Sequence, residues 1–423
     1  MAGQPDNFHR PVRWVGWALL LFTASLIGQD DTDAVRPFLG VGGPGSRANG
    51  LGQAFTAVAD DVTALHYNPA GLAHLFKIEF NLGYDHLSAV SVVQGPNGSS
   101  TASITATRLT NLGLALPIPN TKLTLAFGYH RVRAFDRRQE LAITNGEIST
   151  SEQFTTEGNL GAFSLGIGFQ VSPQFALGGA IDLLSGRSDY TAQATTLTGF
   201  VTDSSQYVQI EPDYRGVGLS LGLLFAPLPV WHVGLLLRTP QRIEVEETYT
   251  DETFNGKTTI DYQTRSSYTL RIGTSLSLGP ALISGDLFWF DYSQVRFKSD
   301  LFDSTALIQD IDIPINAALR ANYTSTLGFA LGTEILLPRV NVKLRGGFRH
   351  EPSYLKAADP SAARSTVAFG FSIMPVPQLK LDATYAVTSW KQDLDRTLFT
   401  GAGITATDRS TASILMVNLI YRL

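Results

Sequence analysis

Apolar and polar residues alternate with a period of two along most of this chain, the spacing that places successive side chains on opposite faces of a β-strand. On one predicted strand, Lys343, Arg345 and Arg349 share one face, while Leu344 and Phe348 share the other. A strand buried on both faces in a soluble core would not accept three like charges on one side. A strand with lipid outside and water or a plug inside would accept them. The pattern therefore predicts the membrane-spanning strands of a β-barrel.

The connections between the predicted strands alternate in length. Tight turns, most of them with proline, lie at residues 117–120, 172–174, 227–229, 279–280, 338–339 and 375–378. Longer polar loops lie near residues 91–100, 134–158, 188–207, 240–261, 299–313, 350–364 and 391–410. These six turns and seven loops join fourteen strands, an even number. Short periplasmic turns opposite long external loops are typical of bacterial outer-membrane barrels.

The predicted strands are long. They span residues 76–90, 101–116, 121–135, 157–171, 174–189, 206–226, 230–249, 258–278, 281–298, 314–337, 340–350, 364–375, 378–391 and 410–423. Most exceed the roughly 9–11 residues that cross a membrane, so their outer ends are expected to project beyond it. A soluble β-sandwich or propeller, the structural alternative, would have shorter strands and evenly short connections. The spacing therefore favours the barrel.

The composition agrees with this fold. The chain has 423 residues, of which 44% are hydrophobic and 16% charged, and its mean hydropathy is +0.05. This value argues against a helical membrane protein, whereas a barrel averages to it because lipid-facing and lumen-facing residues alternate. The net charge is −5 and there is no basic block, so no nucleic-acid partner is expected. Cysteine is absent, which excludes disulfides and thiolate metal sites.

Residues 1–28 have the pattern of a signal peptide. His9, Arg10 and Arg13 form a basic region, and an apolar run at residues 14–27 follows it. A run of this length fits a signal sequence and is too short to span a bilayer. We therefore expect cleavage near the end of this segment. A retained N-terminal anchor is the alternative.

Residues 29–75 differ in composition from the predicted strands. A glycine-dense stretch at residues 40–45 and an alanine-rich stretch at residues 51–61 precede the turn sequence Asn-Pro-Ala-Gly at residues 68–71. The glycines are not followed by the Lys-Ser/Thr of a phosphate-binding loop, so we expect them to supply turns. This composition indicates a compact segment. The chain is therefore divided into a signal peptide (1–28), an N-terminal hatch inside or capping the barrel (29–75) and a fourteen-stranded barrel (76–423).

The most specific stretch of sequence begins at Gly45, runs to Asp61 and continues as Tyr-Asn-Pro-Ala-Gly-Leu at residues 67–72. It resembles the N-terminal signature of the FadL/TodX (OmpP1) superfamily of outer-membrane transport proteins, a signature that the related PorV/PorQ proteins share. The resemblance implies an all-β fold, a 14-stranded antiparallel transmembrane β-barrel with an N-terminal hatch or plug segment. It also implies the outer membrane of a Gram-negative (diderm) bacterium. The residues that match the hatch motif are Asp60, Asp61, Asn68, Pro69, Ala70 and Gly71.

For the transporter branch, the resemblance implies that a hydrophobic molecule is captured outside, binds in the lumen and leaves sideways through an opening in the barrel wall. Movement of the hatch would release it. The chain departs from this pattern in two external loops, because residues 188–207 are polar and residues 240–261 are charged. No apolar landing surface is expected there. The kink in the third strand that would form the opening has Gly128 as its only candidate, and Leu423 replaces the usual C-terminal aromatic residue.

Lumen-facing side chains are the candidates for ligand binding. Strand parity selects one apolar wall, Phe288 and Phe290. It also selects four inward cations, namely Lys343, Arg345, Arg349 and Arg271. A cation in the lumen would bind the carboxylate of a ligand. The alternative is that these cations pair with inward acids, namely Asp286, Glu334 and Asp382.

Neither catalysis nor metal binding is expected. Asp60 and Asp61 with His66 invite a metal or proton-transfer interpretation, but we favour a hydrogen-bond network within the hatch and a helix end as their explanation. The histidines are scattered, and none forms a pair at a spacing that suits a barrel hydrolase. No enzyme activity and no cofactor are therefore expected.

These patterns predict a passive, porin-like transporter that moves hydrophobic small molecules, of the long-chain fatty acid or hydrocarbon type, through a plugged barrel. Its partners would be outer-membrane lipid and the hydrophobic cargo. One alternative is a PorV-like outer-membrane protein that binds or shuttles secreted proteins at its external loops. Another is a structural barrel subunit of an envelope complex. Either alternative would have a secreted or envelope protein as its partner.

Overall fold

A computed structural model provides the structure of the chain. It describes residues 31–39, 42–95, 98–145, 148–198, 201–252, 256–299, 312–396 and 404–423. The predicted signal peptide, residues 1–28, lies outside these residues.

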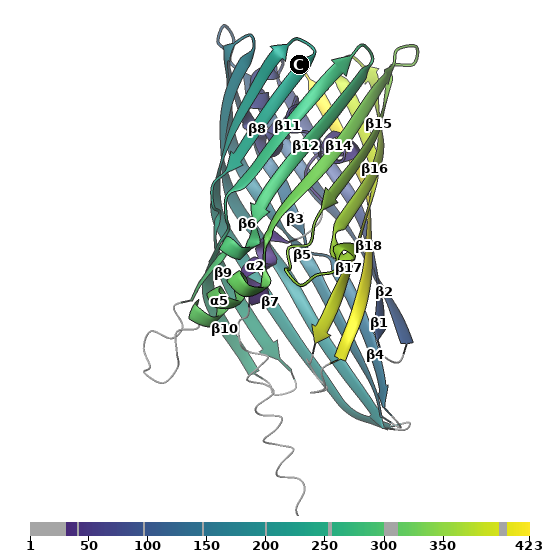
Figure 1. Ribbon diagram of the computed structural model, residues 1–423. Coiled ribbons are helices and arrows are strands. Elements are labelled where there is room, and N and C mark those ends of the chain that lie inside the picture. Colours follow the sequence, from purple (N-terminus) through teal and green to yellow (C-terminus); the bar gives the residue numbers. More distant parts are fainter. Residues whose placement is uncertain are drawn as a thin grey trace, which may run out of the picture.

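The strands form one closed antiparallel sheet (Figure 1). They are β1 (Glu79–Gly95), β2 (Gly98–Pro117), β3 (Leu123–Ala134), β4 (Arg137–Asn145), β5 (Ile148–Ser172), β6 (Phe175–Thr198), β7 (Val201–Leu228), β8 (Trp231–Arg238), β9 (Arg242–Asp251), β10 (Gly256–Arg265), β11 (Thr269–Leu278), β12 (Ala281–Asp291), β13 (Arg296–Ser299), β14 (Ser325–Leu337), β15 (Val342–Glu351), β16 (Arg364–Val376), β17 (Leu379–Arg396) and β18 (Ile404–Arg422). The first and last strands pair along their length, beginning at Glu79 and Arg422, and this pairing closes the barrel.

Eighteen strand segments within the described residues make fourteen crossings. Four crossings are interrupted, so that β3 and β4, β8 and β9, β10 and β11, and β12 and β13 each continue one another. The predicted fourteen-stranded antiparallel barrel is therefore confirmed. The C-terminus lies at the end with the short turns, where the Leu423 N–H donates to the Ile78 carbonyl (2.9 Å). Because short turns are periplasmic in such barrels, the opposite end is external.

The helices are short. They are α2 (Asp31–Val35), η1 (Arg36–Phe38), α3 (Ser46–Gly50), α4 (Ala64–Tyr67), η2 (Pro69–His74), η3 (Tyr292–Gln294), α5 (Asp312–Asn322) and η4 (Pro360–Ala362). Among the described residues, no helix has both the length and the apolar character needed to cross a membrane, which leaves open a crossing by strands.

The two faces of the strands differ as the alternation predicted. On β16, Phe369 is 66% exposed and Phe371 is 46% exposed, whereas Ala368 and Ser372 are buried. The exposed apolar side chains form the outer surface, which suits lipid, and their neighbours point into the barrel.

The expected tenth strand, residues 314–337, is wrong over residues 314–324, nearly its first half. Helix α5 occupies part of it, and β14 begins only at Ser325. Ile315 and Leu319 are both buried, and a spacing of four residues places them on one helical face. The side-chain amide of Asn316 fixes the helix against β13, because it accepts from the Phe297 N–H (3.0 Å) and donates to the Phe297 carbonyl (2.8 Å).

Several of the predicted external loops are paired strands instead. β4 and β5 pair within residues 134–158, β6 and β7 continue past residue 190, and β9 and β10 pair within residues 240–261. These stretches are rich in threonine, which fits a pleated surface well. Their inward side chains also pack together, as in the buried cluster of Phe154, Ala192, Val208 and Tyr249.

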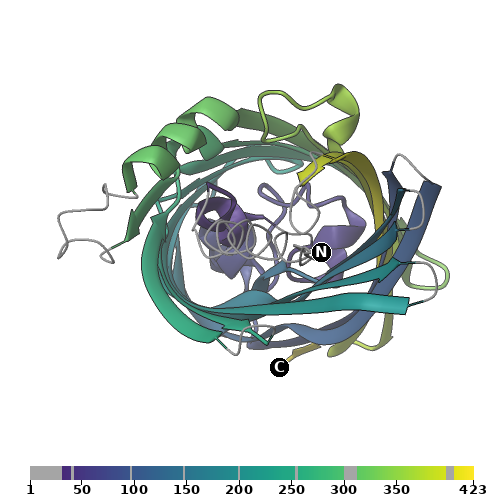
Figure 2. The ribbon, with the colours of Figure 1, turned by 90° about the horizontal axis from the view of Figure 1, so that it is seen from below.

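Residues 42–75, which we call the N-terminal segment, lie inside the barrel (Figure 2). Helix α3 contacts β15 to β18, and η2 contacts β5, β6 and β7. The aromatic and aliphatic side chains of the segment, among them Leu51, Phe55 and Tyr67, are fully buried. The segment is therefore packed against the inner face of the barrel wall.

Candidate ligand cavity in the lumen

The Asn-Pro-Ala-Gly motif fixes the N-terminal segment to the barrel wall. The side-chain amide of Asn68 donates to the carbonyls of Thr56 (2.8 Å) and Leu223 (3.0 Å), and its oxygen accepts from the Ala70 N–H (3.2 Å). The wall opposite is made of glycine. A Cβ at Gly178 would overlap the Pro69 backbone, and a Cβ at Gly222 would overlap the Asn68 side chain. Glycine on β6 and β7 therefore allows the close backbone approach.

The remaining motif residues act within the segment. A Cβ on Gly71 would overlap the carbonyl of Ala59. The carboxylate of Asp61 is buried and accepts from the Thr63 N–H (2.9 Å) and hydroxyl. Asp60 is half-exposed and pairs with Arg47. These contacts favour the hydrogen-bond interpretation of the two aspartates.

Lys343 and Arg345, two of the predicted ligand-binding cations, lie in an ion-pair cluster around Glu334. Arg345 Nε lies 2.6 Å and Lys343 Nζ 2.8 Å from the Glu334 carboxylate. Arg47 of α3 reaches the same carboxylate, with Nε 2.9 Å from its Oε2. Arg345 also pairs with Asp382 (3.1 Å), and its side chain is fully buried. This cluster joins the N-terminal segment to β14, β15 and β17. Lys343 and Arg345 therefore pair with acids, as the alternative to ligand binding predicts.

The other four predicted residues line one lumen cavity of about 120 Å³. They are Arg271 on β11, Phe288 and Phe290 on β12, and Arg349 on β15. The N-terminal segment closes one side of this cavity with Asn49, Gln53 and His66. Of the six predicted residues, Lys343 and Arg345 therefore lie in the ion-pair cluster, and the other four face the lumen cavity.

Phe288 lies between two guanidinium groups in this cavity. The Arg349 Cζ atom is 4.0 Å and the Arg271 Cζ atom 5.4 Å from the centre of its ring. Arg349 donates to the side-chain oxygen of Gln53 (2.8 Å), and Arg271 donates to the Gln53 backbone carbonyl (2.7 Å). Asp286, which is not among the cavity-lining residues, accepts from Arg271 (3.2 Å). Two cations and an aromatic face therefore converge on Gln53.

Three further arginines that the sequence analysis did not select also line the cavity: Arg133, Arg238 and Arg364. Among the described residues that line the cavity, five are arginines and only Glu351 is acidic. Arg133 follows a β-bulge, where the register of β3 against β5 shifts between Arg131 and Arg133. The bulge changes the strand parity, so a period-two reading does not place this side chain. The cavity as a whole is positive.

The barrel wall has a seam near this bulge, between the outer half of β2 and β3. The pairing of β2 with β3 ends at Asn111 and His130, whereas β2 continues to pair with β1 as far as Gly98. Arg108 crosses the seam through its side chain, by an ion pair with Asp136 and a hydrogen bond to the Gly158 carbonyl (3.2 Å). The irregularity therefore lies beyond the expected Gly128, which pairs regularly on both sides.

Residues 44–423 match the model of the family described as outer membrane protein transport protein (OMPP1/FadL/TodX). A search of curated proteins found no match. Among solved structures, a Pseudomonas aeruginosa FadL homologue is similar at a TM-score of 0.65 and 13% identity, over 90% of this chain and 98% of that chain. The P. putida toluene transporter TodX has a TM-score of 0.60 and 12% identity, over 90% and 99% of the two chains. The CymD monoaromatic hydrocarbon channel has a TM-score of 0.55 and 15% identity, over 90% and 98%.

At these identities the solved structures support the fold, while the family model covers nearly the whole described chain. The closed barrel, its lipid-facing apolar surface and the family match agree with one another. This chain therefore belongs to the OMPP1/FadL/TodX family of Gram-negative outer-membrane channels for hydrophobic substrates.

Proposed function

We propose that this channel passes hydrophobic carboxylates, molecules with an apolar body and one carboxylate group such as fatty acids, without an energy source of its own. The lumen cavity carries the proposal, because five arginines and a single acid line it together with Phe288 and Phe290. Guanidinium groups match a carboxylate through two parallel hydrogen bonds. A neutral hydrocarbon would leave these cations without a partner in the ligand.

Gln53 occupies the place that the carboxylate would take. It provides acceptors to both Arg349 and Arg271, and its backbone has a φ of 66°, a left-handed conformation that is uncommon outside glycine. A bound carboxylate would replace these acceptors and would weaken the hold of the wall on the N-terminal segment. We propose that this segment is the plug of the channel and that ligand binding loosens it in this way.

The size of the cavity supports this coupling. Its volume is about 120 Å³. Pockets for small molecules usually have roughly 300 Å³ or more. The additional space that an acyl chain needs must therefore come from movement of the N-terminal segment. The seam at Arg108 is the proposed side exit from the lumen, because a side chain rather than a strand ladder bridges it.

The function is tested by measuring the binding of laurate and of toluene to the purified protein in a detergent that has no carboxylate. We expect Arg349→Gln to weaken laurate binding about tenfold or more, since a hydrogen bond to a charged group contributes about 1.5–3 kcal/mol. Toluene binding should not change. Lys122→Gln is the matched control, because Lys122 is exposed and lies outside the cavity lining.

Equal losses for laurate and toluene would contradict the carboxylate role, and an unchanged laurate affinity would do the same. The hypotheses of a secreted-protein shuttle and of a structural barrel subunit stay predictions. A protein that co-purified in a fixed ratio with the wild-type channel would favour them.

A further inference from the structure

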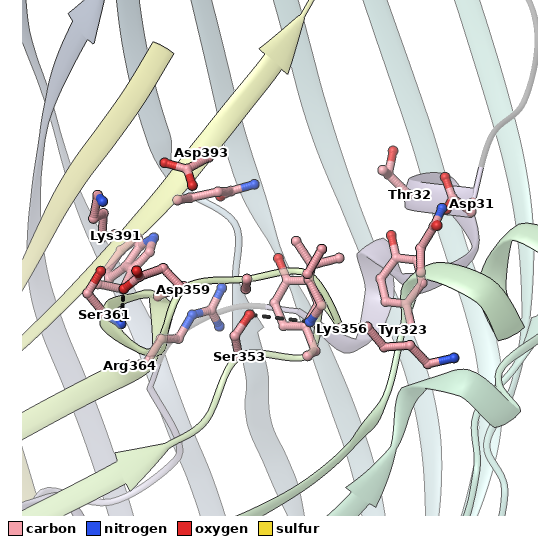
Figure 3. A pocket seen from close by; sticks show the side chains of 18 of the residues that line it. Asp31, Thr32, Tyr323, Ser353, Lys356, Asp359, Ser361, Arg364, Lys391 and Asp393 are labelled. Atoms are coloured by element: carbon pink, nitrogen blue, oxygen red, sulfur yellow. Dashed lines mark hydrogen bonds between the residues drawn. The ribbon is translucent and has the colours of Figure 1, made fainter. Parts of the chain in front are cut away.

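A second and larger cavity, of about 440 Å³, lies at the external end of the barrel wall (Figure 3). The loop between β15 and β16, residues 352–363, forms one side of it. The end of α5 and the start of α2 form another side, and Trp390 to Asp393 of β17 complete it. This external pocket is separate from the two hairpins, near residues 188–207 and 240–261, where polar sequence argued against a landing surface.

Backbone contacts hold the loop in place. The Lys356 N–H donates to the Asn322 carbonyl (2.8 Å), and the Thr324 N–H donates to the Tyr354 carbonyl (2.9 Å). Tyr323 and Leu355 form an antiparallel bridge. The pocket is therefore a shaped space between fixed elements.

Aromatic rings and one cation form the inner side of the external pocket. The rings of Tyr323 and Tyr354 stack with an interplanar angle of 9° and centres 6.0 Å apart. The Arg364 Cζ atom lies 5.9 Å from the Tyr354 ring centre and 5.4 Å from the Trp390 ring centre. Aromatic faces beside a guanidinium fit a molecule that has an apolar body and an anionic group.

The charges of the described residues that line the pocket balance, with three acids and three cations: Asp31, Asp359, Asp393, Lys356, Arg364 and Lys391. The acids have local partners. Asp31 accepts from the Asn322 amide (2.8 Å), Asp393 accepts from the Thr407 hydroxyl (3.0 Å), and hydrogen bonds from Ser361 lower the pKa of Asp359. The lumen cavity, in contrast, has five arginines and one acid. An anionic group is therefore drawn from the pocket towards the lumen.

Arg364 lines both spaces. The Tyr354 ring of the external pocket lies 5.2 Å from the Tyr292 ring, and Tyr292 lies 4.4 Å from Phe290. Tyr292 and Phe290 line the lumen cavity. One layer of side chains thus separates the two spaces, and a row of aromatic rings connects them.

We propose that the external pocket is the capture site for the hydrophobic carboxylate, and that the molecule passes beside Arg364 along this aromatic row into the lumen cavity. The inference rests on the proposed function and adds where the cargo is collected. Arg364 is a shared contact that holds the carboxylate during the transfer from one space to the other.

The test fills the pocket without changing the lumen. Ala358 lines the pocket and is half-buried, whereas Ala317 is exposed on α5 and lies outside the pocket lining. We compare Ala358→Trp with its matched control Ala317→Trp, and measure laurate uptake into proteoliposomes and equilibrium laurate binding in detergent. Arg364→Gln is a second variant that changes the contact shared by both spaces, so its equilibrium laurate binding is measured beside its uptake.

We expect Ala358→Trp to slow uptake about tenfold, equivalent to about 1.4 kcal/mol, with equilibrium binding and the Ala317→Trp variant unchanged. Arg364→Gln should also slow uptake. Wild-type uptake rates in both pocket variants, with laurate binding intact, would overturn the capture site and leave the proposed function standing. Absence of laurate binding to the wild-type lumen would instead overturn the proposed function.

Discussion

Gln53 connects the N-terminal segment to the positive lumen cavity. Its side chain and backbone satisfy Arg349 and Arg271, which would otherwise face the cavity without these acceptors. The left-handed backbone at this residue follows Gly52, whose φ is 63°. A Cβ on Gly52 would overlap the Phe348 backbone, and a Cβ on Gly347 would overlap the Gly52 backbone. A single residue thereby competes with the proposed ligand.

We expect Gln53→Asn to bind laurate about fivefold more tightly, a gain of about 1 kcal/mol, the typical net contribution of one hydrogen bond. Asparagine tolerates the left-handed conformation, and its shorter side chain withdraws the acceptor from Arg349. Calorimetric titration of purified protein measures the affinity. Gln174→Asn, at an exposed periplasmic turn, provides the comparison. A lower affinity in the Gln53 variant would contradict the competition.

Strand parity predicted the inward direction of all six candidate ligand residues but not their surroundings. Arg345 and Arg349 are four residues apart on one face of β15. One is enclosed by Glu334 and Asp382, and the other reaches the cavity. The difference depends on which acidic residues of the neighbouring strands lie at the same level along the barrel axis. The residue pattern of a single strand does not show this.

At the scale of elements, the irregular region of β3 is the most informative. The bulge between Arg131 and Arg133 and the early end of β2–β3 pairing leave an edge that Arg108 bridges through its side chain. Bulges re-aim side chains and end strand pairing, and here the bulge does both.

A covalent bridge across the seam should block transport. The chain has no cysteine, so Arg108→Cys with Asp136→Cys can be joined by a bifunctional maleimide. Laurate uptake into proteoliposomes should fall at least about tenfold, while laurate binding in detergent persists, because only the exit is closed. The same treatment of Leu177→Cys with Leu223→Cys, which face each other across the regular β6–β7 ladder, should have no effect. Undiminished uptake in the first pair would exclude the seam as the exit.

Helix α5 shows a second limit at this scale. Its buried pair, Ile315 and Leu319, has helical spacing, yet the segment lies between stretches of strong strand alternation. The helix forms because the neighbouring β13 provides a surface for it to pack against, and Asn316 of the helix donates a hydrogen bond to that strand. Local pattern alone does not supply that surface.

At the scale of the whole molecule, the barrel and the N-terminal segment form a common interior. The buried ion pair of Glu334 with Arg47 and the hydrogen bond that Asp286 accepts from the Thr56 N–H (3.1 Å) connect inward side chains of the wall with the segment. Buried charges are tolerated only when paired and hydrogen-bonded, so the segment and the lumen surface are mutually dependent. This arrangement suits a channel that is closed at rest.

Removal of residues 42–75 should open the channel. Single-channel recordings in planar bilayers are expected to show a large increase in ionic conductance, because the polar lumen would fill with water. The full-length protein in the same bilayers provides the reference. A conductance equal to that of the full chain would show that the segment does not obstruct the lumen.

The barrel class, the fourteen crossings and the face of each regularly paired side chain could be predicted from the chain's own pattern, because alternation and connection length are local properties. The sequence also identified Asn68 to Gly71 as the family motif of the N-terminal segment. It did not identify Gly178 and Gly222, the wall glycines that contact this motif.

The folded barrel was needed to show which cations face a cavity, where the seam lies and that Arg364 stands between two spaces. Each of these depends on the relative height of residues on different strands, which the tilt and stagger of a closed barrel set. A period of two fixes whether a side chain points inward, and the packing of the whole barrel fixes what it meets there.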